Sequence, residues 1–278
     1  MRIAITGSKG QLGTALQQVL RSHELLLVDL PEYDIADLQS VLRSVGGFCP
    51  RVVIHAAAMT DVDGCERDPE SAYRVNVLGT RNITVAAQGV GAAVLYVSTD
   101  YVFDGARGEP YWEYDEAHPL SVYGRTKWVG EQLVRNLCTR HYVVRTAWLY
   151  GNGTRNFVQA VLRLAREQRR LHMVTDEVGS PTYAADLACA IAQVIRQPAY
   201  GNYHLPSAGA CSRFDWAREI LSLTGQTAVE LVPAENYQRA ARVPKRVELR
   251  NFAGSELGIV MRPWREALRA YVRSTRDP

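Results

Sequence analysis

The chain has 278 residues, of which 47% are hydrophobic and 22% charged, and its formal net charge is +3. This composition is typical of a soluble globular protein, and no apolar run reaches the roughly 18 residues that a membrane helix needs. The small net charge argues against a dedicated nucleic-acid binder and fits a small anionic ligand better. We therefore expect one large domain, or a large domain with a smaller appendage.

The cysteines and histidines give no sign of a metal site. Five cysteines and six histidines are scattered along the chain without a Cys-x-x-Cys pair. His55, in the apolar run VVIHAAA, is predicted to be a hydrogen-bonded core residue rather than a ligand. The N-terminal run MRIAITGSKG breaks at once into glycines, which predicts a first strand and not a signal peptide. The scattered thiols fit a reducing cytoplasm.

Strand-like and helical patterns alternate along the first half of the chain. Short β-branched runs occur at 2–6, 25–29, 51–57, 93–99 and 142–148, separated by segments long enough for crossover helices. Apolar residues at helical spacing predict one long helix over 69–90, and another helix is expected to begin near Ser121. This alternation predicts a Rossmann-type α/β fold with a doubly wound parallel sheet.

The segment ITGSKGQLG places Gly7, Gly10 and Gly13 directly after the first strand. A chain that turns tightly there, lets a pyrophosphate approach its backbone and then opens a helix needs glycine at these positions. The pattern therefore predicts a dinucleotide site rather than a plain glycine turn. Asp29 ends the next strand at the distance where a carboxylate binds the adenosine ribose, although it could also be a turn residue before Pro31.

The regular alternation loosens beyond Tyr150. Loops that contain glycine and proline separate helical stretches such as 156–168 and 212–225. We expect residues 1–150 to form an NAD(P)-binding Rossmann domain. Residues 151–278 are expected to form mainly a smaller substrate-binding part, interleaved with the sheet.

Two further segments carry polar groups at informative positions. The strand in YVSTDYVFDG ends in Ser98, Thr99 and Asp100, where an open α/β sheet places its ligand crevice. The segment VYGRTK places Tyr123 four residues before Lys127, one of only three lysines in the chain. Alone, this spacing fits a common surface pair on a helix as well as a functional pair.

Four segments together resemble the extended short-chain dehydrogenase/reductase family and, within it, the dTDP-4-dehydrorhamnose reductases. They are TGSKGQLG, HAAAMTDVDGCE, STDYVFDG and YGRTKWVGE, and the likeness continues through RTAWLYGNGTRNFV and GSPTYAADLA. The resemblance covers most of the chain, and its motifs coincide in order. It implies a reductase that uses NADPH or NADH and acts on a small-molecule nucleotide sugar.

The resemblance also implies roles for individual residues. Tyr123 and Lys127 would be the catalytic phenol and ammonium, because a nearby cation favours the phenolate and a lysine can also bind the nicotinamide ribose. Thr99 and Asp100 would be the active-site hydroxyl and its neighbouring acid, both beside the substrate. The remaining contacts would be Gly10, Gln11 and Leu12 at the pyrophosphate, Asp34 and Ile35 at the adenine, Ala58, Met59 and Thr60 at the nicotinamide, and Trp148 at the sugar.

Several alternatives stay open. Trp148 could equally be a packing residue. Asp29 should favour NADH, whereas Lys9 could meet the 2'-phosphate of NADPH, so we expect both cofactors to be used. Ala15 stands where some relatives carry a metal-binding glutamate at a dimer interface, so no metal-bridged dimer is expected, and the chain could be a monomer or a homodimer. The altered segment RVPKRVEL leaves diphosphate binding by Arg242 open.

We predict reduction of the C4 ketone of dTDP-4-dehydro-L-rhamnose to dTDP-L-rhamnose. A sugar-nucleotide 4,6-dehydratase is the nearest rival within the superfamily, but it needs an acidic pair where this chain has Asp100 and Tyr101, and a phenol lacks a suitable pKa. A non-catalytic NADP-binding subunit, resembling that of methionine adenosyltransferase, is the rival from another class. It would bind the cofactor without turnover. Another nucleotide-sugar 4-ketoreductase is a further alternative.

Overall fold

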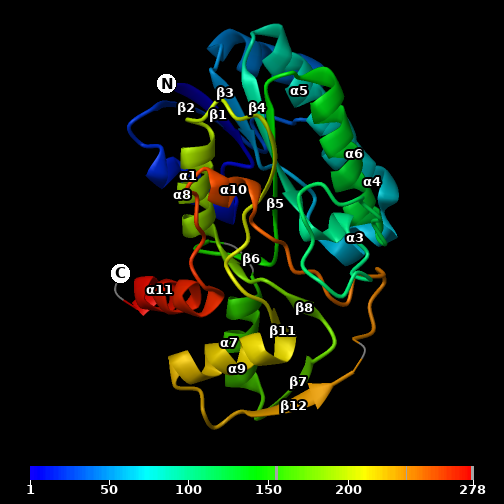
Figure 1. Ribbon diagram of the computed structural model, residues 1–278, viewed down its shortest axis with the longest axis vertical. Helices are drawn as coiled ribbons and strands as arrows, with labels where there is room; N and C mark the ends of the chain where they lie inside the picture. Colours follow the sequence, from blue (N-terminus) through cyan, green and yellow to red (C-terminus); the bar gives the residue numbers. More distant parts are fainter. Residues whose placement is uncertain (154–155, 236, 277–278) are drawn as a thin grey trace.

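A six-stranded sheet, in the order β10-β5-β4-β3-β1-β2, organises the fold (Figure 1). The computed structural model describes residues 1–153, 156–235 and 237–276. Each neighbouring pair of strands is parallel, which confirms the predicted doubly wound sheet. The strand order reverses between β1 and β3, so the ligand crevice should lie beyond the carboxyl ends of these strands. The strands are β1 (Arg2–Thr6), β2 (Glu24–Val28), β3 (Val52–His55), β4 (Ala93–Thr99), β5 (His141–Thr146) and β10 (Gly201–His204).

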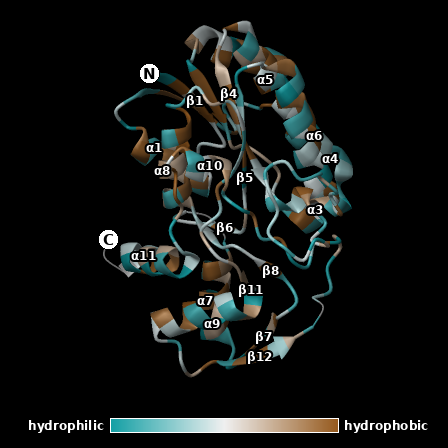
Figure 2. Ribbon diagram, viewed as in Figure 1, coloured by the Kyte–Doolittle hydropathy of each residue, from teal (hydrophilic) through white to brown (hydrophobic). Residues whose placement is uncertain are grey.

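Helices cover both faces of the sheet. Ile3 and Ile5 of β1 pack with helices α1 (Gln11–Val19) and α8 (Ala184–Val194) on one face. Ala4, between them in the sequence, belongs to the core on the other face, with α5 (Thr80–Gly89) and α6 (Val122–Leu137). Figure 2 shows the apolar colour gathered in β1 and in α8, while polar residues are prominent on α11 (Trp264–Arg276). Burial on both faces explains why the strands are nearly continuous apolar runs.

The two helices predicted from periodicity are present. The stretch predicted as one long helix over 69–90 consists of α4 (Pro69–Tyr73), a π-helical segment (Arg74–Gly79) and α5, which follow one another without a break. Asp68 caps its first turn by accepting a hydrogen bond from the Ser71 amide. Ser121 caps α6 by accepting from the Gly124 amide at 3.1 Å. Shorter helices are α2 (Leu38–Val41), a second π-helical segment (Leu42–Gly46), α3 (Val62–Arg67) and the 3-10 turn η3 (Asp100–Val102).

The second half of the chain builds a lower lobe around a separate aromatic core. This core contains Tyr150, Trp216, Trp264 and Tyr271. Between segments of the lower lobe, the chain returns to the sheet, where α8 packs against α1 and β10 pairs with β5. The functional division at residue 150 stays a prediction. Helix α10 (Ala253–Glu256) contacts β10 and packs on the core of the sheet. The lower elements are α7 (Phe157–Glu167), α9 (Arg213–Thr224), α11, β6 (Leu149–Tyr150), β7 (Arg170–Val174), β8 (Val178–Gly179), β9 (Thr182–Tyr183), β11 (Cys211–Ser212) and β12 (Glu230–Ala234).

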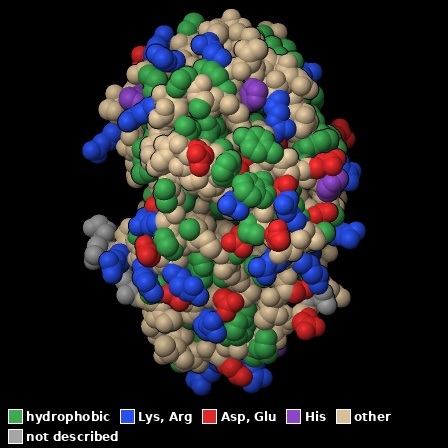
Figure 3. Space-filling model, in the orientation of Figure 1, with side chains coloured by type: hydrophobic (Ala, Val, Ile, Leu, Met, Phe, Trp, Pro, Cys, Tyr) green, Lys and Arg blue, Asp and Glu red, His purple; other side chains and the backbone are tan. Residues whose placement is uncertain are grey.

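The surface carries both signs of charge. On the face shown in Figure 3, Lys and Arg side chains are interspersed with Asp and Glu side chains over the lower lobe. Within the described part of the chain, no helix is both long enough and apolar enough to cross a bilayer. Of the loop predicted at YGNGT, Thr154 lies outside the described residues.

Candidate active site

A pocket of about 670 Å³ lies at the carboxyl edge of the sheet and brings together residues from widely separated segments. Met59 is not among its lining residues. Instead, the Met59 backbone is clamped by Asn76, which accepts from its N–H at 2.8 Å and donates to its carbonyl at 3.1 Å. All the other predicted site residues line the pocket: Gly7, Gly10, Gln11, Leu12, Gly13, Asp29, Asp34, Ile35, Ala58, Thr60, Thr99, Asp100, Tyr123, Lys127 and Trp148.

The glycine turn after β1 is packed too tightly for side chains. Gly7 has a φ of +66°, and a Cβ there would lie 2.8 Å from the backbone nitrogen of Ala57. A Cβ on Gly13 would lie 2.2 Å from the carbonyl oxygen of Gly7. Gly10, at the N-cap of α1, has no side chain with which to cap the helix. The first amides of α1 therefore remain suited to an anion such as a pyrophosphate.

The end of β2 holds an exposed cluster of charges. Asp29 accepts hydrogen bonds from the backbone N–H groups of Lys9 at 2.7 Å and Leu30 at 2.8 Å. The Lys9 ammonium donates to Glu32 Oε2 at 2.8 Å and to the Leu30 carbonyl at 2.5 Å. Glu32 is absent from the residues that the sequence predicts, although its place three residues after Asp29 is a signal that could have identified it. Lys9, proposed to meet a phosphate, is thus paired with a carboxylate of the same chain.

The opposite end of the pocket is buried. The end of β4 places Thr99, and the first two turns of α6 place Tyr123 and Lys127 on one face of that helix. Thr99 is 6% exposed, and Asp100 and Lys127 are 3% exposed. The Thr99 hydroxyl donates to Asp100 Oδ1 at 2.9 Å. The Lys127 ammonium lies 4.1 Å from the centre of the Tyr96 ring.

Burial shifts the protonation of these groups. It raises the pKa of Tyr123, and a hydrogen bond with Thr99 opposes the rise. It lowers the pKa of Lys127 to about 7, opposed by the charge of Glu131. It also raises the pKa of Asp100 to about 7, opposed first by the hydrogen bond from Thr99. Lys127 and Asp100 therefore both change charge near neutral pH, which suits groups that control a proton transfer.

Trp148 lies between the pocket and the lower core. Its ring stacks on that of Trp216 at a centroid distance of 5.7 Å, and the Arg213 guanidinium lies 3.5 Å from its centre. Arg213 also lines the pocket, and it forms an ion pair with Glu177 at 3.5 Å. Arg213 was not predicted, because its position at the start of a helix does not reveal which way its side chain points.

Two other expectations concern residues outside the pocket. His55 is fully buried and hydrogen-bonded to the hydroxyls of Thr6 at 2.6 Å and Thr80 at 3.0 Å, so it is the core residue that was predicted. Burial lowers its pKa to about 3. Among the described residues, no group of three or more His, Cys, Asp and Glu side chains is arranged to hold a metal ion.

Comparison with known proteins assigns the chain to a family. It matches the family model of the RmlD substrate binding domain over residues 1–276. It is 38% identical to the spore coat polysaccharide biosynthesis protein SpsK of Bacillus subtilis, over 98% of this chain and 97% of that protein. A solved dTDP-4-dehydrorhamnose reductase of Clostridium acetobutylicum matches with a TM-score of 0.95 and 41% identity, over 99% of this chain and 100% of the other.

The same enzyme of Bacillus anthracis, solved in complex with NADP, matches with a TM-score of 0.95 and 38% identity, over 98% of this chain and 99% of the other. These likenesses extend along nearly the whole chain and agree with the glycine turn and the Tyr-x-x-x-Lys pair in the pocket. The chain belongs to the dTDP-4-dehydrorhamnose reductase family, within the extended short-chain dehydrogenases/reductases.

Proposed function

We propose that the protein reduces the C4 ketone of dTDP-4-dehydro-L-rhamnose to give dTDP-L-rhamnose, with NADPH or NADH as cofactor. One observation carries this proposal: a glycine turn suited to a pyrophosphate lines the same pocket as Tyr123 and the buried Thr99 and Lys127. The names of the relatives agree with this reaction, and the NADP in the Bacillus anthracis structure agrees with the cofactor.

The pocket fits a nicotinamide dinucleotide. A Cβ on Gly7 or Gly13 would collide with backbone atoms, so the turn presents bare backbone to a ligand. The uncapped start of α1 would hold the pyrophosphate through Gly10, Gln11 and Leu12. Asp34 and Ile35 would flank the adenine, and Ala58 and Thr60 the nicotinamide. Met59 would contribute through its backbone at most, because Asn76 fixes that backbone.

A bound nicotinamide cofactor supplies the hydride for the ketone carbon, and the protein controls the proton. The Tyr123 hydroxyl gives its proton to the ketone oxygen as that oxygen gains negative charge. Lys127, one helical turn away, favours the resulting phenolate because its ammonium carries the opposite charge. The Thr99 hydroxyl donates to Asp100 in the structure, and it would stabilise the same ketone oxygen once its single proton turns from Asp100 to that oxygen.

The lower lobe would form the sugar-nucleotide side of the pocket. Trp148 offers a flat apolar face to the hexose, and Arg213, on α9, brings a cation to the pocket wall. We therefore propose that residues 1–150 mainly hold the cofactor and residues 151–278 mainly hold the substrate. Strand β10, which joins the sheet, and helices α8 and α10, which pack on its core, also belong to the second segment. The five free cysteines are compatible with the proposed cytoplasmic location.

One assay tests the proposal against both rivals. The protein is incubated with NADPH and dTDP-4-dehydro-6-deoxy-L-lyxo-hexose, and the absorbance of the reduced nicotinamide is followed. We expect turnover in the parent protein and a large loss in Tyr123→Phe. Tight cofactor binding without turnover would instead support the non-catalytic subunit. Release of water from a dTDP-hexose would support the dehydratase, which the buried phenol of Tyr101 beside Tyr123 makes unfavourable.

A further inference from the structure

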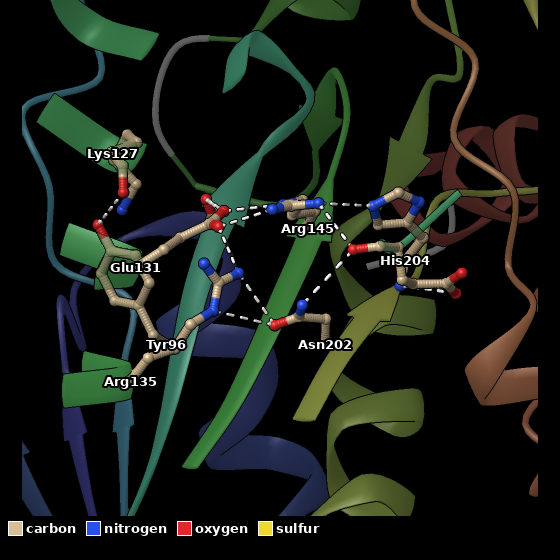
Figure 4. Close-up of polar contacts among 9 residues, drawn as sticks. Tyr96, Lys127, Glu131, Arg135, Arg145, Asn202 and His204 are labelled. Atoms are coloured by element: carbon tan, nitrogen blue, oxygen red, sulfur yellow. Dashed lines mark hydrogen bonds and ion pairs between the residues drawn. The ribbon is translucent and has the colours of Figure 1, made fainter. Parts of the chain in front are cut away.

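A buried carboxylate lies one helical turn beyond Lys127 (Figure 4). Glu131 is four residues after Lys127 on α6, and 0% of its side chain is exposed. The Arg145 guanidinium donates two hydrogen bonds to this carboxylate, from Nε to Oε1 at 2.8 Å and from Nη2 to Oε2 at 2.7 Å. Ser98 donates to Oε1 at 2.6 Å, and Arg135 donates to Oε2 at 2.8 Å. Glu131, Arg135 and Arg145 are absent from the pocket lining.

Stability alone does not explain this arrangement. Taking a carboxylate and a guanidinium out of water costs free energy, and apolar residues of similar volume often stabilise a protein as well or better. The carboxylate is nevertheless held from three elements, by Ser98 at the end of β4, Arg145 of β5 and Arg135 of α6. Arg145 is fixed in turn, because its Nη1 donates to the Glu113 carbonyl at 3.2 Å and lies 3.3 Å from His204 Nε2. The geometry keeps one ionised carboxylate at one place.

Among the groups around Lys127, the Glu131 carboxylate is the one that can stabilise the Lys127 ammonium by its charge. Glu131 comes from the same helix, the Tyr96 ring comes from β4, and His55 comes from β3. Burial keeps His55 neutral at physiological pH, because its pKa is lowered to about 3. Burial also keeps Tyr96 neutral, since it raises the pKa of this phenol. Of these groups, Glu131 alone carries a negative charge.

We propose that Glu131 is a positioning residue that keeps Lys127 protonated for proton transfer from Tyr123. This inference rests on the proposed reductase function. Arg145, Ser98 and Arg135 hold Glu131 ionised, and the charge of Glu131, one helical turn from Lys127, favours the ammonium form of Lys127 without a direct ion pair. The directions of the pKa shifts of Glu131 and Lys127 agree with this role. Burial opposes ionisation of Glu131, but the hydrogen bonds and charge of Arg145 dominate and lower its pKa, while the charge of Glu131 raises the pKa of Lys127.

The sequence makes a direct test possible, because the chain has only three lysines. Protein labelled with ¹³C at the lysine Cε gives three resonances, and loss of one in Lys127→Arg assigns that residue. We expect the Lys127 titration in Glu131→Gln to move down by about one to three pH units, as removal of a close opposite charge does. Lys9 and Lys245 serve as internal controls and should not move. Glu131→Asp keeps the charge, so its Lys127 titration should stay closer to that of the parent, even if the shorter side chain lowers the melting temperature more.

The pH at which the rate of hydride transfer falls on the alkaline side should shift together with the Lys127 pKa measured from its resonance. Activity requires protonated Lys127, so lowering its pKa moves the loss of activity to lower pH. If Glu131→Gln does not fold, the double variant Glu131→Gln/Arg145→Gln removes both charges and should show a smaller downward shift, because loss of the Arg145 cation acts in the opposite direction. A folded variant, judged by its near-ultraviolet circular dichroism, with an unchanged Lys127 titration would overturn the proposal. Because the resonance requires no sugar nucleotide, absence of reductase activity would refute the proposed function without deciding this one.

Discussion

The two ends of the pocket hold their charges in opposite surroundings. At the exposed end, proposed to bind the adenosine, the side chains of Lys9 and Glu32 form an ion pair while 57% and 60% exposed. Behind the proposed catalytic end, those of Glu131 and Arg145 form an ion pair while 0% and 3% exposed. Water screens the first pair, so its charges can have only a small effect on the preference for NADH or NADPH. The second pair lies out of water, where a missing partner changes the protonation of its neighbours.

The largest effect should come from removing the proton donor at the buried end. Tyr123→Phe keeps the ring but not the hydroxyl, so turnover should fall by about 10²- to 10⁴-fold, the usual contribution of general acid catalysis. Cofactor affinity should be nearly unchanged. Stopped-flow measurement of hydride transfer checks this prediction, and a rate close to that of the parent would remove Tyr123 from the mechanism.

Lys127→Arg should also abolish most turnover, although it keeps the positive charge. The space beneath Lys127 is filled by the Tyr96 ring, 4.1 Å from the ammonium, and a planar guanidinium cannot take the place of a compact ammonium there. The expected result is a loss of kcat with a smaller change in melting temperature than for Lys127→Glu, which buries the wrong charge. Near-normal activity would show that the buried end tolerates any cation.

Trp148→Ala probes the wall between the pocket and the lower core. We expect a higher KM for the sugar nucleotide and a smaller change in the KM for NAD(P)H. Because Trp148 is only partly buried, the free energy of unfolding should fall by less than the roughly 3–5 kcal/mol lost when a fully buried aromatic residue is replaced by alanine. Trp112→Ala is the matched control, since Arg250 stacks on that partly buried ring at 3.9 Å and it does not line the pocket. Equal KM values in both variants would assign Trp148 to packing alone.

Some of these features could be predicted from the sequence and others could not. Gly7, Gly10 and Gly13 follow a strand at fixed spacing, so their place in the pocket follows from local rules for turns and helices. The Tyr123–Lys127 face likewise follows from one helical turn. Arg213 and Arg145 escaped prediction because their partners come from other parts of the chain, whereas Glu32 could have been identified from its place three residues after Asp29. Such contacts depend on how the elements pack.

The pH dependence of stability tests the burial of Asp100. Its pKa is raised to about 7 from about 3.9 in an unfolded chain. Between these two pH values the Asp100 carboxyl is protonated in the folded state and ionised in the unfolded state. Its contribution to the free energy of unfolding therefore falls as the pH rises from about 4 to about 7 and is constant at higher pH. The parent should therefore lose stability relative to Asp100→Asn between about pH 4 and pH 7. Denaturant titrations of both proteins measure this difference, and parallel curves would show that Asp100 is ionised throughout.

The smallest effects belong to the exposed end, where we propose that the choice between NADH and NADPH is made. Two carboxylates, Asp29 and Glu32, oppose the 2'-phosphate of NADPH, and Lys9 could meet that phosphate only by exchanging it for Glu32. A single exposed charge contact is worth on the order of 1 kcal/mol and is screened by salt. We therefore expect kcat/KM values for the two cofactors within about tenfold of each other.

Substitutions at this end should move the cofactor ratio in opposite directions. Lys9→Ala should shift it toward NADH. Asp29→Ala should shift it toward NADPH, and so should Glu32→Gln, because it releases the Lys9 ammonium for the phosphate. Glu24→Gln is the matched control: Glu24 also lies in an exposed ion pair on β2, with Arg2 at 3.3 Å, but at the other end of the strand. Fluorescence titration with each cofactor and steady-state kinetics give the ratios. A thousandfold preference in the parent, or ratios that none of the three substitutions changes, would mean that these side chains do not contact the adenosine ribose and that the exposed end lies elsewhere.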